Sequence, residues 1–436
     1  MSPLEQVVPV RSLGLWEATC AVLARTTQGG GNVVAVVQGE GPMTEAVVKQ
    51  AMQIMFDRHQ TLRCRFTESG SVPRFIDDVQ FEDVPLLVQH AQTEDELIGI
   101  WEQMVREPLP DVRRLWELRF VPTPDGSTWR LMIKMSHAIA DGRSLIHVVD
   151  QLVQCAAEFI NGSQSEPVNM LLPAHAEARV GERMDRLTYL KKFEEAGALV
   201  PRTPWLVDHE ADLSSRRPRI ALRQLDAPTT EHLRSRCHDH GVTVLEAIVG
   251  ALAVIQAKHA NHSNHIVDAD FCVPVDMRRF FEPPADLREI QMAAYCLRVL
   301  LRDVRADDDP WDVGQRFHND FVPQLTPAYL PPWDATDEDV IRSSEAWGAM
   351  EDHYSMGFCP TNIGVVPTLD HPPLRTHAVD MTAATQAGGY PILVPIMTHK
   401  GVLRTTFSWT EPLMEAQTAA AWMDDIWGLL TEMALG

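Results

Sequence analysis

Two patterns of apolar residues meet near position 136 and predict a strand followed by a helix. Over 129–135, Leu131, Ile133 and Met135 alternate with Arg130 and Lys134, as in a half-buried strand. From 145 to 156 the apolar residues recur at helical spacing. The residues between the two patterns, 136–142, are therefore predicted to form a strand-to-helix loop.

This loop, which reads SHAIADG, contains the best candidate chemistry in the chain. Neutral imidazole has a pKa near working pH, so His137 is a candidate base. Asp141 stands where an N-cap carboxylate accepts the first free backbone N–H groups of a helix, and that role alone explains it. A histidine and an aspartate at this spacing are a weak signal by themselves, so other segments must decide between catalysis and capping.

The rest of the chain predicts two α/β lobes. Its 436 residues exceed one ordinary core. The first lobe is predicted over 1–165 and ends in a polar stretch, and a proline-rich and charged connector over 166–219 contains one helical segment near 189–195. The second lobe, 220–436, is predicted to contain a helix over 243–259, opened by the Thr243 and Glu246 capping box, and a strand over 266–275.

Besides the His137 loop, four segments occur in an order typical of one family: 11–17 with the later stretch 57–66, then 241–247, 273–278 and 361–366. Together they resemble the chloramphenicol acetyltransferase superfamily, specifically its two-lobed members. These are the condensation domains of peptide synthetases, the alcohol acetyltransferases and the polyketide-associated acyltransferases of mycobacterial lipid synthesis. The resemblance spans nearly the whole chain, and its specificity lies in the joint order of the segments.

The resemblance implies an α/β fold of two sandwich lobes that form a pseudo-dimer, with the site in a tunnel between them. His137 would act as general base, and Arg278 would pair with Asp141 and fix the loop. Thr361 and Asn362 would close the site from the second lobe, and the Thr361 hydroxyl or a nearby backbone N–H is a candidate donor to the oxyanion.

Two positions qualify the resemblance. Condensation domains usually have two adjacent histidines, whereas Ser136 precedes His137 here; the second histidine is the acting one, so the chemistry is retained. Gly142 would let a pantetheine arm of the donor run close to the backbone, but a glycine at a helix start explains it equally well. The opening segment is more similar to alcohol acetyltransferases, which favours an ester product.

The expected function is transfer of an acyl group from coenzyme A or an acyl carrier protein to a small alcohol, in secondary metabolism. The first alternative is a carrier-dependent condensation enzyme that forms an amide or releases a synthetase-bound chain. The second is a non-catalytic binding or scaffold protein of the same fold. A thiolate leaves readily, so no metal or cofactor is expected beyond the acyl carrier itself.

Composition excludes several other classes. The net charge of -22, from 60 acidic and 38 basic residues, argues against a nucleic-acid surface. No apolar run approaches the roughly 20 residues of a membrane span, and the N-terminus lacks a signal pattern, so a cytoplasmic protein is expected. Seven scattered cysteines without a Cys-x-x-Cys pair indicate reduced, mostly packed thiols.

Three further patterns receive structural interpretations. His259, His262 and His265 could bind zinc, but they lack the usual neighbouring ligands, and a solvated loop after a helix end is favoured. The glycine run 29–31 lacks the ending of a phosphate-binding loop and is interpreted as a flexible turn. No Gly-x-Ser-x-Gly elbow is present, which argues against a serine hydrolase.

Overall fold

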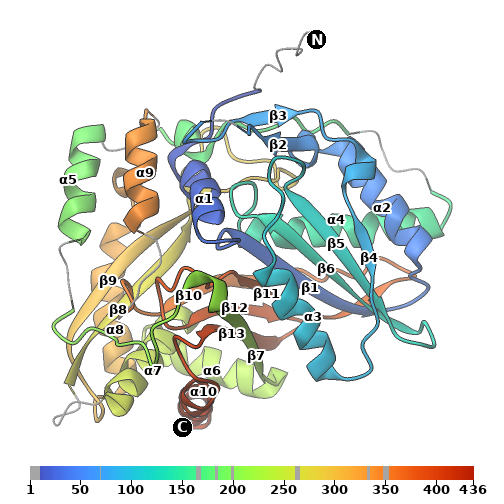
Figure 1. Ribbon diagram of the computed structural model, residues 1–436. Helices are drawn as coiled ribbons and strands as arrows, with labels where there is room; N and C mark the ends of the chain where they lie inside the picture. The colour runs from blue at the N-terminus through green and yellow to red at the C-terminus, as the bar shows by residue number, and fades with distance from the viewer. Residues whose placement is uncertain are drawn as a thin grey trace.

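Two mixed β-sheets form the framework of the protein, and each is built mainly from one half of the chain (Figure 1). The computed structural model describes residues 10–68, 70–163, 168–181, 185–197, 201–260, 266–330, 334–346 and 353–436. The order of the first sheet is β11 (Arg375–Ala383), β1 (Asn32–Glu40), β6 (Thr128–Ser136), β5 (Trp116–Pro122) and β4 (Leu86–Val88). All neighbours in it are antiparallel except β4 and β5.

The second sheet has the order β10 (Cys359–Val366), β12 (Leu393–His399), β13 (Val402–Glu411) and β7 (Arg217–Leu225). Strands β8 (Ile266–Asp276) and β9 (Ala294–Arg305) form an antiparallel pair, which a bridge from Phe271 to Phe358 connects to the beginning of β10. A small pair, β2 (Cys64–Phe66) and β3 (Phe75–Asp77), completes the described strands.

The α-helices of the described residues are α1 (Leu15–Thr26), α2 (Glu45–Arg58), α3 (Glu94–Arg106), α4 (Gly142–Ile160), α5 (Arg186–Gly197), α6 (Ala227–Asp239), α7 (Val244–His259), α8 (Pro310–Phe321), α9 (Asp337–Ala346) and α10 (Ala416–Leu435). Short 3-10 helices span Gln60–Arg63, Phe81–Asp83, Ala176–Arg179, Leu213–Ser215, Met277–Phe280, Val322–Gln324 and Pro327–Tyr329. Figure 1 shows α5 and α9 side by side at one edge, with α10 at the opposite end.

Apolar side chains on both faces of β1 explain why it lies inside the first sheet. Val33 and Val37 belong to the large cluster that also includes residues of α2 and α4, while Val34 and Val36 pack in a second cluster with residues of α3. Helices therefore cover both faces of this sheet. In the second half, residues of α7, α10, β12 and β13 share a separate cluster, so the protein has two main cores.

The half-buried interpretation of β6 is wrong, because its expected solvent face is also covered. Lys134 on that face is only 1% exposed, and its ammonium lies 2.9 Å from the Glu117 carboxylate on the neighbouring strand β5. Pairing with a carboxylate allows a charged side chain to be buried here. The alternation along 129–135 identified the strand correctly but not its second packed face.

Several local predictions are confirmed. The helix after Asp141 is α4, the capped helix of the second half is α7, and the predicted strand 266–275 is β8. The helical segment predicted inside the connector is α5. The predicted lobes are continuous stretches, whereas β11 of the second half pairs with β1, so the second half contributes one strand to the first sheet.

Two further expectations concern the state of the cysteines and the presence of a membrane-spanning helix. All seven cysteines are free thiols, and six of them are buried. Within the described ranges, no single helix is long and apolar enough to cross a membrane, although the bent pair α6 and α7 passes that test of length and composition when taken together.

Candidate active site

His137 is held at the end of β6 by two hydrogen bonds to the backbone. Its N–H donates to the Gly31 carbonyl (2.7 Å), and its ring Nδ1 lies 2.9 Å from the Ala140 carbonyl oxygen. A carbonyl oxygen can only accept, so Nδ1 carries the proton and Nε2 has the free lone pair. No hydrogen bond to Nε2 is found among the described residues, which leaves this nitrogen available to a substrate.

The imidazole of His137 is neutral at physiological pH. Burial lowers its pKa below the ordinary histidine value, and this effect outweighs the opposing influence of the Ala140 carbonyl and of the Asp141 charge. A neutral ring with a fixed tautomer can take a proton at Nε2. The geometry therefore suits a general base.

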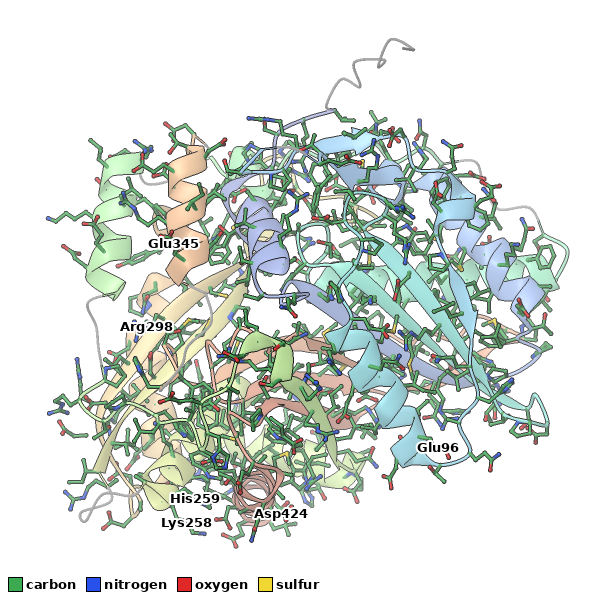
Figure 2. All side chains as sticks on the ribbon, viewed as in Figure 1. Glu96, Lys258, His259, Arg298, Glu345 and Asp424 are labelled. Atoms are coloured by element: carbon green, nitrogen blue, oxygen red, sulfur yellow. The ribbon has the colours of Figure 1, made fainter. Side chains whose placement is uncertain are left out.

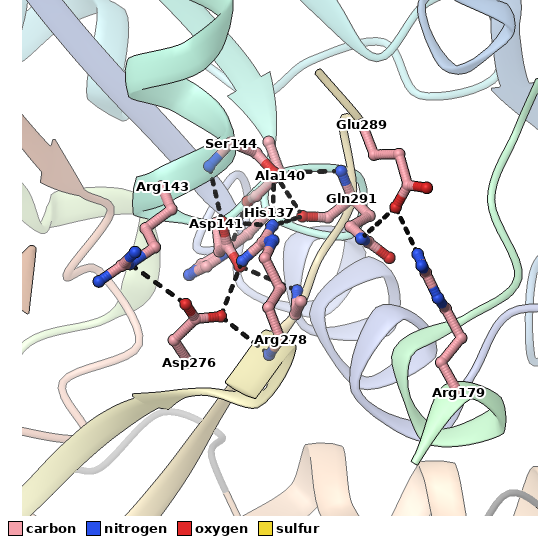
Figure 3. A network of polar contacts seen from close by, with 11 residues as sticks. His137, Ala140, Asp141, Arg143, Ser144, Arg179, Asp276, Arg278, Glu289 and Gln291 are labelled. Atoms are coloured by element: carbon pink, nitrogen blue, oxygen red, sulfur yellow. Dashed lines mark hydrogen bonds and ion pairs between the residues drawn. The ribbon is translucent and has the colours of Figure 1, made fainter. Parts of the chain in front are cut away.

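Asp141 is bonded to residues of the second half of the chain, among them Arg278 (Figure 3). Its side chain caps α4 by accepting from the Ser144 N–H at 2.8 Å, and it also accepts from the Ala293 N–H at 2.9 Å. Arg278 donates to both of its oxygens, at 2.7 and 3.2 Å. The carboxylate is only 3% exposed, and although burial opposes its charge, Arg278 and the two N–H donors hold its pKa below the usual range.

Arg278 connects several segments around this carboxylate. It lies in the 3-10 helix Met277–Phe280, and it also donates to Asp276 Oδ1 at 3.0 Å, to the Ser144 hydroxyl at 2.8 Å and to the Gln291 carbonyl at 3.2 Å. Although burial disfavours the guanidinium charge, the carboxylates of Asp141 and Asp276 raise the pKa of Arg278. The network therefore holds the beginning of α4 against residues 276–293 of the second half.

A small apolar pocket, here called the catalytic pocket, lies beside His137. Its volume is about 130 Å³, and both halves of the chain line it. From the first half come His137, residues of α1 such as Trp16, and the turn at Gly30 and Gly31; from the second half come Thr361, residues of β8, β9 and β11, and Tyr390. The imidazole thus meets mostly apolar walls at the junction of the two lobes.

The structure brings most of the predicted site residues together, but not Asn362. Thr361 lines the catalytic pocket, with its hydroxyl 3.8 Å from the Cys359 sulfur. Asn362 is exposed and does not line the pocket; its side-chain oxygen accepts from the Gly364 N–H at 2.9 Å. This bond lies at the register shift between β10 and β12, so the Asn362 amide supports the bulge.

Gly142 also lines the pocket, and packing between the halves accounts for it. A Cβ at this position would lie 2.5 Å from Ile363 Cδ1 and 3.2 Å from Met381 Sδ. Ile363 and Met381 belong to β10 and β11. The missing side chain therefore lets the beginning of α4 approach two strands of the second half, which is a packing reason for glycine.

Comparison with known proteins places this site in a family. The model of the wax ester synthase/diacylglycerol acyltransferase catalytic domain matches residues 86–238, and that of the phthiocerol/phthiodiolone dimycocerosyl transferase C-terminus matches 214–387. The two matches follow each other along the chain and include His137 and Arg278. Both matches support the chloramphenicol acetyltransferase superfamily for this chain.

Solved structures with the same two-lobed α/β fold include several members of this superfamily. Polyketide synthase associated protein 5 from Mycobacterium tuberculosis is 15% identical, with a TM-score of 0.69 over 99% of both chains. The trichothecene 15-O-acetyltransferase of Fusarium sporotrichioides is 11% identical, with a TM-score of 0.72 over 97% of this chain and 95% of that one. The predicted fold is confirmed by these matches.

A curated sequence relative belongs to the peptide-synthetase branch of the superfamily. A nonribosomal peptide synthetase of Emericella nidulans is 24% identical over 241 residues, which are 51% of this chain. The match covers only 3% of that synthetase, so this chain spans a very small part of its relative's length. The proteins that this chain resembles thus include both an acetyltransferase and a peptide synthetase.

The glycine turn was not recognised as part of the site from the sequence. Gly31 supplies the carbonyl that accepts from the His137 N–H, and a Cβ on Gly31 would lie 2.6 Å from the Cys20 carbonyl oxygen of α1. The turn thus brings α1 close to the end of β6. The run of three glycines was a visible signal, but its partner lies more than a hundred residues away in the sequence.

The histidine cluster considered for zinc is only partly described. His262 and His265 lie outside the described residues. His259 Nε2 lies 2.7 Å from the Asp425 carboxylate of α10, and Figure 2 shows His259 and Lys258 near Asp424 at that edge of the molecule. Within the described ranges, no group of three or more histidine, cysteine, aspartate or glutamate side chains is arranged to hold a metal ion.

Proposed function

We propose that this protein transfers an acyl group from a thioester to a hydroxyl group, with His137 as general base, in secondary metabolism. The donor is coenzyme A or an acyl carrier protein, and the acceptor is a small alcohol. The observation that carries the proposal is the free Nε2 of a neutral His137 at the catalytic pocket, with Nδ1 held by the Ala140 carbonyl.

The proposed reaction proceeds through one tetrahedral intermediate. His137 Nε2 takes the proton of the acceptor hydroxyl while the oxygen attacks the thioester carbonyl carbon. The carbonyl oxygen becomes an oxyanion, for which the Thr361 hydroxyl is the candidate donor at the pocket. The carbon–sulfur bond then breaks, the thiolate takes the proton from His137, and the products are an ester and a free thiol.

Asp141 and Arg278 act in this proposal as positioning residues. Arg278 and two backbone N–H groups satisfy the Asp141 carboxylate, so it does not need to relay a proton. Their pairing holds Asp141, which directly follows the Ala140 carbonyl, and that carbonyl determines the His137 tautomer. We propose no metal or cofactor beyond the acyl carrier, because the thioester itself supplies the leaving group.

The second candidate is a carrier-dependent condensation enzyme that forms an amide or releases a synthetase-bound chain. The match to a nonribosomal peptide synthetase favours it. It differs from the first candidate in needing a phosphopantetheinylated protein partner. A non-catalytic scaffold of the same fold remains the third alternative, and a demonstration of turnover would exclude it.

Thiol release from a panel of short, medium and long acyl-coenzyme A donors tests the proposal, with mixed alcohol and amine acceptors. His137→Ala should lower the rate by roughly 10²–10⁴-fold, the usual contribution of a general base. His232→Ala is the matched control, because this histidine is exposed on α6. Equal release from the wild type and His137→Ala would refute the mechanism, and release only with carrier-bound donors would favour the condensation enzyme.

A further inference from the structure

A second and much larger cavity is lined in part by residues adjacent in sequence to those of the catalytic pocket. Its volume is about 650 Å³, within the range of small-molecule sites. Ser136 lines it directly before His137, and Gly29 lines it directly before the glycines of the catalytic pocket. Residues adjacent in sequence thus line the two spaces at the end of β6 and at the glycine turn.

Arginine side chains give this space, here called the arginine cavity, its chemical character. Arg25, Arg106 and Arg216 line it together with two carboxylates, Glu107 and Asp111. The rest of its wall combines polar and apolar residues, whereas the catalytic pocket is mostly apolar. The cavity therefore suits a polar, charged molecule, whereas the catalytic pocket suits an acyl chain.

The two carboxylates already have arginine partners. Arg25 Nε lies 2.6 Å from Asp111 Oδ2, and Arg119 Nη2 lies 2.6 Å from Glu107 Oε2. Arg106, the last residue of α3, is exposed and has no ion pair among the described residues. Its guanidinium thus remains available to an anion that enters the cavity.

The arginines of this cavity contrast with the negative charge of the protein as a whole. At a net charge of -22 the surface repels anions in general, so an anionic ligand needs a local group of cations. A guanidinium recognises a carboxylate through two parallel N–H donors, which adds geometric selectivity to the attraction. A neutral alcohol would make no use of Arg106.

We propose that the arginine cavity binds the acceptor, that this acceptor carries a carboxylate beside its reacting hydroxyl, and that Arg106 determines the preference for the carboxylate. The inference rests on the proposed function and specifies its substrate class as a hydroxycarboxylic acid. The reacting hydroxyl would pass from this cavity to His137 Nε2, while the acyl chain of the donor occupies the catalytic pocket. Arg106 would touch the acceptor's carboxylate and not the reacting atoms.

Paired acceptors test the preference. Initial rates are measured with 3-phenyllactate and with its neutral amide, using the best donor from the acyl-coenzyme A panel. The wild type should prefer the acid, and Arg106→Ala should raise KM for the acid about tenfold while leaving kcat and the amide unchanged; tenfold corresponds to about 1.4 kcal/mol. Arg106→Lys should recover part of the loss, because it retains the charge without the bidentate geometry.

Two controls separate the acceptor from other sources of negative charge. Arg234→Ala removes an exposed arginine on α6, outside the cavity lining, and should leave both acceptors unaffected. Acyl thioesters of N-acetylcysteamine replace coenzyme A and carry no phosphate. If Arg106→Ala raises KM only for the coenzyme A donor, the cavity recognises donor phosphate and the proposal is overturned.

Calorimetric titration of 3-phenyllactate and its amide into the unreacted protein makes the inference independent of turnover. Binding of the acid that Arg106→Ala weakens about tenfold supports the cavity assignment, even if no acyl transfer is found and the proposed function fails. Acyl transfer with no preference for the acid refutes the inference but not the function. The absence of acid binding to the wild type at millimolar concentration also overturns the inference.

Discussion

Replacing Arg278 with alanine would leave a buried carboxylate with too few partners. Asp141 would retain the Ser144 and Ala293 N–H donors but lose both bonds from the guanidinium, while remaining almost unexposed. Removing one partner of a buried ion pair costs about 3–5 kcal/mol, because the remaining charge is uncompensated. If the 436 residues unfold in one transition, the entropy of unfolding is about 2.1 cal/mol/K per residue. Dividing the lost free energy by the total entropy gives a fall in Tm of about 3–5 °C.

The same substitution should collapse acyl transfer while donor binding persists. The loop between β6 and α4 would lose its contact with the second half, and with it the placement of the Ala140 carbonyl that orients His137. Thermal unfolding, thiol release and titration of a non-reacting donor analogue measure the three effects. Arg279→Ala is a matched control, because this neighbouring arginine is exposed and has no ion pair among the described residues.

A double variant separates the orphaned charge from the lost contact. Asp141→Asn combined with Arg278→Ala removes the uncompensated charge, so its Tm should exceed that of Arg278→Ala alone, whereas activity should stay low. A Tm no higher than that of the single variant would show that the orphaned charge is not the cause of the loss. Wild-type stability and turnover in Arg278→Ala would refute the whole account of this pair.

Three further predictions follow from burial and close packing. Because burial lowers the pKa of His137, kcat/KM should rise with pH with a midpoint below the ordinary histidine pKa. A midpoint at or above about pH 6.5 would contradict the assignment of His137 as the base. Gly142→Ala should lower the free energy of unfolding in urea by about 1–3 kcal/mol, because the new Cβ clashes with Ile363. Gly99→Ala in α3 is the control and should not destabilise the protein, because a Cβ there meets open space. Equal effects of the two substitutions would be inconsistent with the packing argument. Burial lowers the pKa of His399 to about 4, so below about pH 6.5 the unfolded chain binds a proton that the folded protein does not. Stability should therefore fall by up to about 3 kcal/mol toward pH 4. His399→Leu should flatten this fall, and an unchanged pH dependence of unfolding would disprove the assignment.

Local structure near the site could be predicted from the sequence because it depends on local patterns. The alternation along β6, the cap at Asp141 and the capping box of α7 each involve residues a few positions apart. The buried Lys134 shows the limit of such patterns. Its position on the polar face of β6 was correct, but its partner Glu117 comes from another strand and is not visible in the alternation.

The assembled site needed information that no local pattern contains. The pairing of Arg278 with Asp141 came from the family resemblance, because 137 positions separate the two residues. Neighbours in sequence also separate in space: Thr361 lines the catalytic pocket, whereas the adjacent Asn362 faces away at a bulge. Such a bulge depends on how β10 pairs with β12, and this is a property of the folded sheet.

Strand β11, which the second half contributes to the first sheet, explains how the two halves keep a fixed relation at the site. It pairs with β1, which in turn pairs with β6, the strand that ends at His137. On the same strand, Met381 packs beside Gly142, and the Thr382 hydroxyl lies 2.6 Å from the Ser408 hydroxyl of β13 in the second sheet. Continuous contacts therefore connect the base to the second sheet without involving the connector.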